Sequence, residues 1–409
     1  MIQLTYSNRT EDLLDALAAD LARLRARIHP LEPLRLVLPD RNLEAWVKQG
    51  LARRLGIAAN LQVHYLRRFV AGLVQDAGLP PLLDGRAIYD GLLSLFLDED
   101  VLAGEAFAEV RAYLHAGGAT EGALARRRHQ LARRLALLFE EYGYSRPQMI
   151  ARWEAGEGGS GAEAWQRALW LELRRRKEDF SSLAALLERL SLLEPPKEPL
   201  HLFGISHVAH AFHRILARLA EGGELHVYTL NPCREFWEDL PTVREARRGG
   251  VLDEEDPFNL SGGGETPPLS LWGRPGRENI RLLNELTDCD FREAFTEGRT
   301  DSLLHQVQAD ILHRRPERKE PEPGFDFEED RSIEVLAAPG IRREAEAIAA
   351  RIWELVSEDP SLRFNEIAVA VAGRDPELHF SHLVAAFEES YDIPYSLTDV
   401  SLLGRSEVA

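Results

Sequence analysis

The stretch Ile2–Thr10 (IQLTYSNRT) decides the fold, because a short apolar run leads directly into a helical pattern that continues to Ile28. Two further runs repeat this arrangement. They are Leu34–Leu38, followed by a helix through Trp46 to Leu55, and Leu61–Tyr65, followed by a helix over Leu66–Gln75. Strands that alternate with helices are typical of a parallel sheet covered by helices. We therefore expect an α/β domain, with Asn8 or Thr10 capping its first helix.

The pattern changes to helices between about residues 80 and 195, where apolar residues recur at spacings of three and four. Strand character returns at Leu200–Phe203 and Leu225–Leu230, with a helix over Val208–Ala220 between them. We therefore expect one α/β domain interrupted by an all-helical insertion. The helices expected in the insertion are Ile88–Leu97, Phe107–Leu114, Glu121–Tyr142, Arg146–Trp153, Ala162–Arg176 and Ser181–Leu193.

The C-terminal part begins a second unit of the same kind. Residues 249–268 are rich in Gly, Asp, Glu and Pro and predict a loop, whereas Ile280–Leu286 and Ser302–His313 predict helices. Beyond a charged, proline-containing segment, strands are expected at Ile333–Leu336 and Ile367–Ala372, with helices at Arg342–Ser357 and Leu378–Ser390. The expected boundaries are 1–79 and 199–313 for the first α/β domain, 80–198 for the helical insertion, 314–330 for a linker, and 331–409 for the truncated start of a second α/β domain.

Composition favours a cytoplasmic protein and leaves a nucleic-acid partner open. The chain has two cysteines and neither a secretory leader nor an apolar run long enough for a membrane span. Its formal net charge is −18, but the first 200 residues carry equal numbers of basic and acidic residues, with the arginines clustered. Such clusters are usually solvated helix faces; several on one surface would form a groove that follows phosphates. The clusters include Arg67/Arg68, Arg126/Arg127/Arg128, Arg133/Arg134 and Arg174/Arg175/Arg176.

No sequence motif identifies a catalysed reaction. A phosphate-binding loop needs glycines and a Lys after the first strand, and the turn Tyr6–Thr10 has neither. His207, His210 and His213 lack the flanking carboxylate that would complete a metal site, and no nucleophile elbow is present. We therefore expect a motor-type α/β domain that binds no ATP, with no cofactor, no metal and no ATPase or nuclease active site of its own.

Several unusual segments recur in the same order in one known family. They run from Tyr6–Arg9 to Ile393–Tyr395 and include Gly56–Asn60, Ala164–Gln166, Phe203–Ser206, Asn231–Arg234, Trp272–Arg277 and Leu303–Leu312. In order and wording they resemble the RecC family, the gamma subunits of exodeoxyribonuclease V (RecBCD).

The resemblance implies a fold similar to superfamily 1 helicases (RecA-like, P-loop NTPase-type) that has lost its nucleotide motifs. It implies a non-catalytic subunit that splits duplex DNA, guides the strands, and scans the 3′-ending strand for a recombination signal during double-strand break repair by homologous recombination. The implied partners are DNA and RecB-like and RecD-like helicase subunits, without a membrane. RecC-like proteins are much longer, so the chain is expected to be an N-terminal portion.

The resemblance also places a strand-scanning surface, at Pro39, Arg41, Ala45, Tyr65, Ala71, Leu137, Leu138, Glu140, Glu141 and Arg146. Ala45 and Ala71 stand where the family has glutamine and tryptophan, and Leu137 replaces an acid, so no particular signal sequence is carried over. Tyr65 is the best candidate for stacking on a base. Together with the arginine clusters, the expected DNA-binding residues are Arg41, Tyr65, Arg67, Arg68, Arg126, Arg127, Arg128, Arg133, Arg134, Glu140 and Arg146.

Two other hypotheses stay open. One is an AddB-type helicase–nuclease subunit, which would carry an iron–sulfur nuclease domain at its far end. The other is a pure protein–protein scaffold, in which the arginines contact acidic surfaces of partner proteins.

Overall fold

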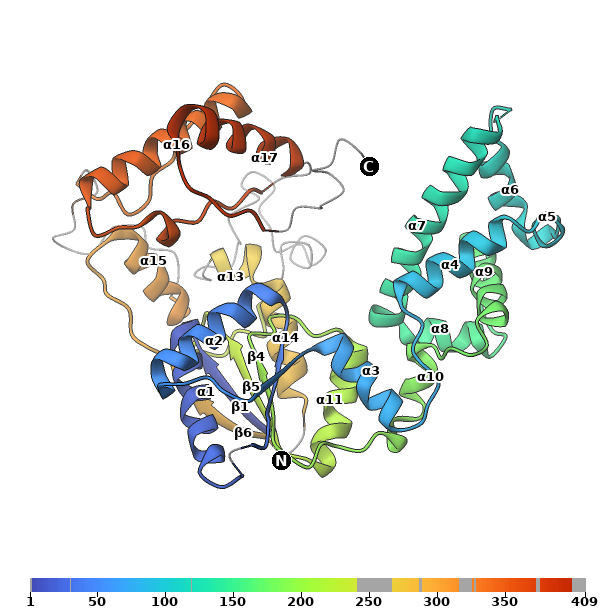
Figure 1. Cartoon of the computed structure of the whole chain (residues 1–409), viewed down its shortest axis with the longest axis horizontal. Helices are drawn as coiled ribbons and strands as arrows, with labels where there is room; N and C mark the ends of the chain where they lie inside the picture. The colour runs from blue at the N-terminus through green and yellow to red at the C-terminus, as the bar shows by residue number, and fades with distance from the viewer. Residues whose placement is uncertain are drawn as a thin grey trace. The chain divides into compact units, whose positions relative to one another are not determined.

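The computed structural model describes residues 2–29, 31–118, 120–240, 267–286, 289–315, 326, 329–372 and 376–398. The chain divides into two compact units, Met1–Phe325 and Asp326–Ala409. Figure 1 shows the elements of both units. The predicted loop at 249–268 and linker at 314–330 lie largely outside the described residues, and the domain boundaries expected from the sequence stay predictions.

A parallel sheet of six strands organises the first unit, in the order β3-β2-β4-β5-β1-β6. Every neighbouring pair is parallel, as the alternation of strands and helices predicts. The α/β prediction is thereby confirmed. The strands are β1 (Ile2–Ser7), β2 (Leu34–Leu38), β3 (Leu61–Tyr65), β4 (Leu200–Phe203), β5 (Leu225–Leu230) and β6 (Cys289–Glu293).

Helices cover both faces of this sheet because successive strand residues point to opposite sides. Leu36 and Leu38 pack with α1 and α2 on one face, whereas Val37 packs with α3, α11 and α14 on the other. The helices of this part are α1 (Thr10–Arg25), α2 (Arg41–Leu55), α3 (Leu66–Asp76), α11 (His210–Gly222), α13 (Pro267–Trp272), α14 (Arg274–Asn284) and α15 (Leu303–Leu312).

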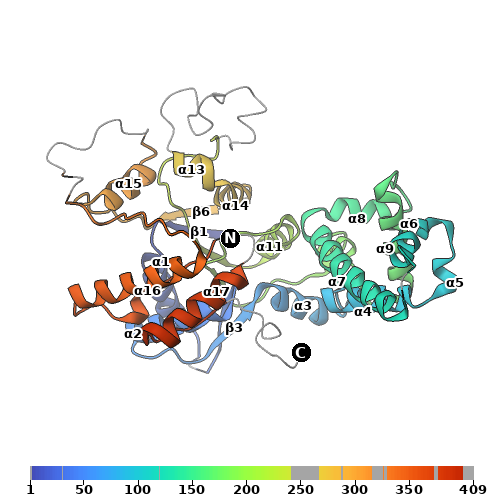
Figure 2. The same cartoon turned by 90° about the horizontal axis from the view of Figure 1, so that it is seen from above.

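A helical subdomain with a core of its own is inserted between α3 and β4. Its longest helix, α7, has 25 residues (Glu121–Ser145) and packs against α4 and α6. Figure 2 shows these helices together from above. The other helices of the insertion are α4 (Gly85–Phe96), α5 (Glu99–Leu102), α6 (Ala108–His115), α8 (Pro147–Glu154), α9 (Ala162–Arg176) and α10 (Leu183–Leu187).

The second unit is helical in its described part. Helices α16 (Ile341–Glu358) and α17 (Pro376–Ala385), with the π-helix that follows over Ala386–Tyr391, enclose a small core. The strands predicted at Ile333–Leu336 and Ile367–Ala372 are wrong: neither segment forms a strand or pairs with one among the described residues. A strand exists only through hydrogen bonds to a neighbour, and Val335 is 92% exposed.

Two local predictions were also wrong, and one strand was missed. Helix α1 begins after Arg9 and has no side-chain cap, because Asn8 bonds to Thr296 instead. The helix expected over Ser181–Leu193 is broken into α10, which Ser182 caps, and a 3₁₀ turn at Leu190–Leu192. Strand β6 was missed, because three of its five residues (CDFRE) are charged and it lies at the edge of the sheet.

Candidate nucleic-acid interface

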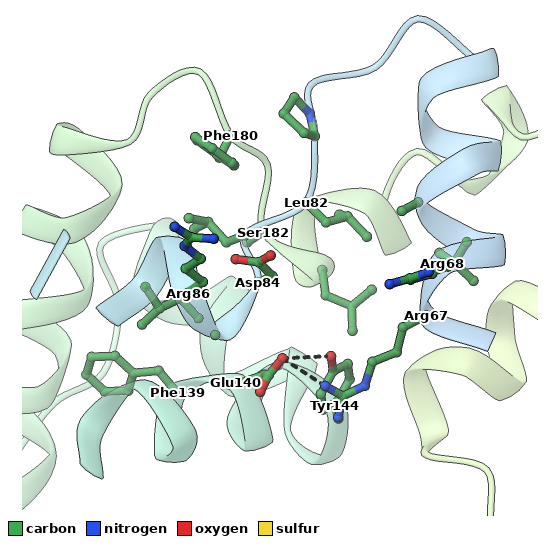
Figure 3. A pocket seen from close by; sticks show the side chains of 18 of the residues that line it. Arg67, Arg68, Leu82, Asp84, Arg86, Phe139, Glu140, Tyr144, Phe180 and Ser182 are labelled. Carbon is green, nitrogen blue, oxygen red and sulfur yellow. Dashed lines mark hydrogen bonds and ion pairs between the residues drawn. The ribbon is translucent and has the colours of Figure 1, made fainter. Parts of the chain in front are cut away.

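A pocket of about 970 Å³ lies within the first unit where α3, α7 and the segment 78–86 meet (Figure 3). Its walls are mostly apolar, and aromatic rings from α7, α9 and α11 contribute to them. Three expected site residues line it together: Arg67 and Arg68 from α3, and Glu140 from α7. Ala71, at a position where the resemblance implies tryptophan, lines it as well.

Arg67 and Glu140 connect the sheet-bearing part of the unit to the helical insertion. Arg67 Nη1 donates to Glu140 Oε1 at 3.0 Å, and its guanidinium lies 4.5 Å from the centre of the Tyr144 ring. The Tyr144 hydroxyl donates to the same Glu140 oxygen at 3.2 Å. Burial raises the pKa of Tyr144, so its hydroxyl stays protonated and acts as a donor.

Arg68 and Arg86 face the pocket from opposite sides (Figure 3). Both are exposed, and neither forms an ion pair with any described residue. Asp84 also lines the pocket, and its carboxylate accepts the backbone N–H of Ala87 at 2.7 Å and so caps α4. The pocket therefore offers guanidinium groups that the described chain leaves unneutralised.

Tyr65 and Arg41 lie at the carboxyl ends of β3 and β2. Tyr65 ends β3, and its hydroxyl donates to Glu44 Oε2 on α2 at 2.6 Å. This bond raises the pKa of Tyr65, and the bonds from Lys48 and Tyr65 lower the pKa of Glu44. The hydroxyl is thus held in place while the ring stays half-buried. Arg41 is the exposed first residue of α2, after the capping residue Asp40.

Exposed arginines lie on the same face of α7 as the pocket residues Glu140 and Tyr144. Residues in a helix are about 100° apart, so Arg126, Arg133, Glu140 and Tyr144 lie within an arc of about 40°. Arg126, Arg133 and neighbouring Arg134 are exposed and form no ion pair with a described residue. We call Arg126, Arg133 and Arg134 the α7 stripe. Arg126 and Arg133 continue the face of Glu140 along the helix, and Arg134 lies about 100° from Arg133 around the helix.

Arg127 and Arg128 are not part of the α7 stripe. Arg127 Nη1 donates to the carbonyl oxygens of Leu114 and Ala116, at 3.0 and 2.6 Å, and so closes the C-terminus of α6. Arg128 forms an ion pair with Glu99 and is only 14% exposed. In the run Arg126–Arg128, the side chain of Arg126 is therefore exposed, whereas Arg127 and Arg128 stabilise the insertion.

Arg146 follows α7, and its guanidinium lies 5.7 Å from the centre of the Tyr142 ring. It is exposed, as are Ala45, Glu141 and Leu137 among the other positions that the resemblance implies. Two pocket residues were missed from the sequence. Arg86 stands outside every arginine cluster, and Tyr144 belongs to a recurring segment but carries no chemical motif of its own.

The turn after β1, where a nucleotide-binding domain would hold phosphates, is closed by side chains. Asn8 Nδ2 donates to the Thr296 carbonyl and Asn8 Oδ1 accepts its N–H, both at 3.0 Å. The Thr296 hydroxyl donates to Asp12 Oδ2 at 2.6 Å. A carboxylate in the first turn of α1 repels a phosphate, and no Lys is present to offset it.

Neither metal nor membrane chemistry has support in the described part of the chain. No three His, Cys, Asp or Glu side chains there gather in a way that could hold a metal ion. His207 precedes α11, which begins at His210. None of the described helices combines the length and apolarity needed to cross a bilayer.

Comparison with known proteins identifies the family. A family profile described as "RecC, N-terminal domain" matches residues 2–314. The RecBCD enzyme subunit RecC of Escherichia coli K12 is 28% identical over 98% of this chain and 39% of its own length. The RecC subunit of Mycolicibacterium smegmatis is 30% identical over 90% of this chain and 33% of its own length. The chain thus spans about two fifths or less of the length of these relatives, and it belongs to the RecC family.

Proposed function

We propose that this chain is the DNA-guiding N-terminal part of an exodeoxyribonuclease V subunit and acts without catalysis of its own. It would bind a duplex end and the single-stranded 3′ tail, and guide that strand during double-strand break repair by homologous recombination. Its partners would be RecB-like and RecD-like helicase subunits in the cytoplasm. RecC relatives named as subunits of the RecBCD enzyme support this assignment.

The observation that carries the proposal is the α7 stripe beside a pocket lined by Arg67, Arg68 and Arg86. Arginines without internal partners are available to phosphates, and two residues of the stripe, Arg126 and Arg133, lie on the same arc of α7 as Glu140 and Tyr144. Half-exposed aromatic rings near the path, such as Tyr65, offer surfaces on which bases stack. Arg41 and Arg146 are further exposed arginines that we include in this surface.

The parallel sheet and the closed turn after β1 support a helicase-like domain that has lost its nucleotide site. The turn has an Asp12–Thr296 contact where a phosphate loop would offer free backbone amides. We therefore assign no ATPase role to this part of the chain. All the curated relatives reported above are RecC subunits, which favours RecC over the AddB-type alternative.

The test is equilibrium binding of a fluorescein-labelled single-stranded oligodeoxynucleotide to the purified chain across a salt series. The proposal predicts weak binding whose logarithm falls steeply and linearly with the logarithm of salt concentration. Binding that ignores salt, or no binding even at low salt, contradicts it. An ATP hydrolysis assay of the same sample is expected to show no turnover above buffer.

A further inference from the structure

We infer that Glu140 competes with the DNA backbone for Arg67, so that the Arg67–Glu140 ion pair limits how tightly the pocket holds single-stranded DNA. The inference rests on the proposed function, because it requires a strand that reaches the pocket. It gives Glu140 a role opposite to that of the arginines around it (Figure 3).

Glu140 is fixed from its own side of the pocket. It accepts the Tyr144 hydroxyl at 3.2 Å, and the Tyr144 ring stacks on Phe212 of α11 with the ring centres 5.3 Å apart. The carboxylate side chain is only 17% exposed. Glu140 therefore stays in place when its partner moves.

Arg67 is free to leave the pair. Its side chain is 63% exposed, and the contacts that hold it are the Glu140 carboxylate and the Tyr144 ring. A guanidinium binds carboxylate and phosphate oxygens with the same forked geometry. A phosphate that enters the pocket mouth therefore takes the position of Glu140 at Arg67.

Moving Arg67 from Glu140 to a phosphate has a free-energy cost. Once Arg67 has turned to a phosphate, Glu140 is a poorly solvated carboxylate that has lost its cation and lies next to an anionic strand. Arg68 and Arg86 stay available to offset that charge. Net attraction at the pocket is therefore weaker than three arginines alone would give, which suits a surface over which a strand slides.

The test compares Glu140→Gln with the unaltered chain in the same single-stranded DNA titration. Glutamine keeps the shape and an oxygen that accepts the Tyr144 hydroxyl, but it releases Arg67. We expect binding about threefold to tenfold tighter, the range set by one part-exposed ion pair. The salt dependence steepens by about 0.7 units, because one more arginine contacts a phosphate without first leaving a carboxylate.

Two matched variants separate this effect from a general change of charge. Glu141→Gln removes the same charge one residue along α7, and the structure gives Glu141 no contact with Arg67, so its effect is expected to be clearly smaller. In Arg67→Ala/Glu140→Gln the gain disappears, because it acts through Arg67. Should Glu140→Gln disturb folding, Glu140→Asp withdraws the carboxylate by one methylene and is expected to tighten binding in the same direction, less strongly.

The outcomes separate the inference from the proposed function. Equal tightening in Glu140→Gln and Glu141→Gln, a gain that persists without Arg67, or unchanged or weaker binding in Glu140→Gln overturns the inference alone. Failure of the unaltered chain and of every variant to bind DNA at low salt overturns both. Tightening confined to chains that keep Arg67 supports both.

Discussion

Helices α7 and α9 both carry runs of arginines, yet the structure uses the two runs differently. On α9, Arg174 donates to the carbonyl oxygen of Phe180 at 2.6 Å, Arg175 pairs with Glu172, and Arg176 pairs with Glu172 and Asp98. On α7, the stripe of Arg126, Arg133 and Arg134 has no described ion-pair partner. The first run stabilises the insertion, and the second is available to an external anion.

The difference shows that a cluster of arginines predicts a phosphate surface only where the fold supplies no acceptors. Helix α9 ends next to its own turn at Lys177–Phe180, which offers carbonyl oxygens, and near Asp98 at the start of α5, which offers a carboxylate. Near the α7 stripe, the acceptor oxygens at the end of α6 and on α5 are bound by Arg127 and Arg128 instead. The same residue type therefore has opposite roles on two packed helices of one subdomain.

The largest effect is expected from removing the α7 stripe. Arg126→Ala/Arg133→Ala/Arg134→Ala should weaken single-stranded DNA binding about tenfold to thirtyfold at low salt and flatten the salt dependence by about two units. The melting temperature should not fall, because these side chains have no described internal partner. Unchanged affinity for single-stranded DNA would show that the arginines of the α7 stripe do not bind DNA, and so would contradict the different roles assigned to α7 and α9.

A substitution on α9 tests whether the arginines of that helix stabilise the insertion. Arg176→Ala removes the contacts with Glu172 and Asp98 and should lower the free energy of unfolding by about 1–2 kcal/mol. Denaturant unfolding measures this, and DNA affinity should change less than about twofold if the side chain faces no phosphate. A loss of affinity without a loss of stability would mean that α9 also contacts DNA.

The pH dependence of folding stability tests the sheet, where polar side chains such as His201 are buried. His201 on β4 contacts the Tyr228 hydroxyl at 3.1 Å, and burial lowers its pKa from the ordinary value of 6.5 to about 3. Protonation therefore favours the unfolded chain: the stability from neutral His201 is full above pH 6.5 and is lost as the pH falls toward 3. The loss should be about 1 kcal/mol per pH unit.

Unfolding of the unaltered chain and of His201→Gln, measured between pH 6.5 and 5, checks this prediction. The variant should lose less stability over that interval, since glutamine has no proton to gain. Parallel losses in both chains would show that other groups, and not His201, cause the acid sensitivity.

The smallest expected effects come from two adjacent residues of α7. Arg126→Ala should weaken DNA binding about threefold and leave stability unchanged. Arg127→Ala should lower the free energy of unfolding by about 1 kcal/mol, because the C-terminal carbonyls of α6 lose their donor, and leave binding unchanged. If Arg126→Ala instead lowers stability and Arg127→Ala instead weakens DNA binding, the assignment of Arg126 to the DNA-binding face of α7 is wrong.

Much of the sheet could be predicted from the sequence because β1 to β5 are apolar runs bounded by turns and helices. Strand β6 could not, since a charged edge strand such as CDFRE has no hydrophobic signal. The same apolar pattern gave a wrong strand prediction at Ile333–Leu336, where the run has no pairing partner among the described residues.

The candidate site was predictable only as a set of residue types. Tyr65 at a strand end and the pairs Arg67/Arg68 and Arg133/Arg134 could be identified, but their neighbours could not. Whether an arginine is available depends on acceptors distant in sequence: Arg67 meets Glu140, 73 residues away, and Arg176 meets Asp98, 78 residues away. Only the packing of α3 beside α7, and of α9 beside the start of α5, brings these groups together.

Photocrosslinking to a forked duplex whose single-stranded arm carries bromodeoxyuridine tests the central claim most directly. If this chain guides a DNA strand past α3 and along α7, peptides from Leu66–Asp76 and Glu121–Ser145 should carry most of the label, and added salt should reduce it. If no label falls within residues 40–150, the arginines face a protein partner instead, and the assignment of a DNA path is wrong.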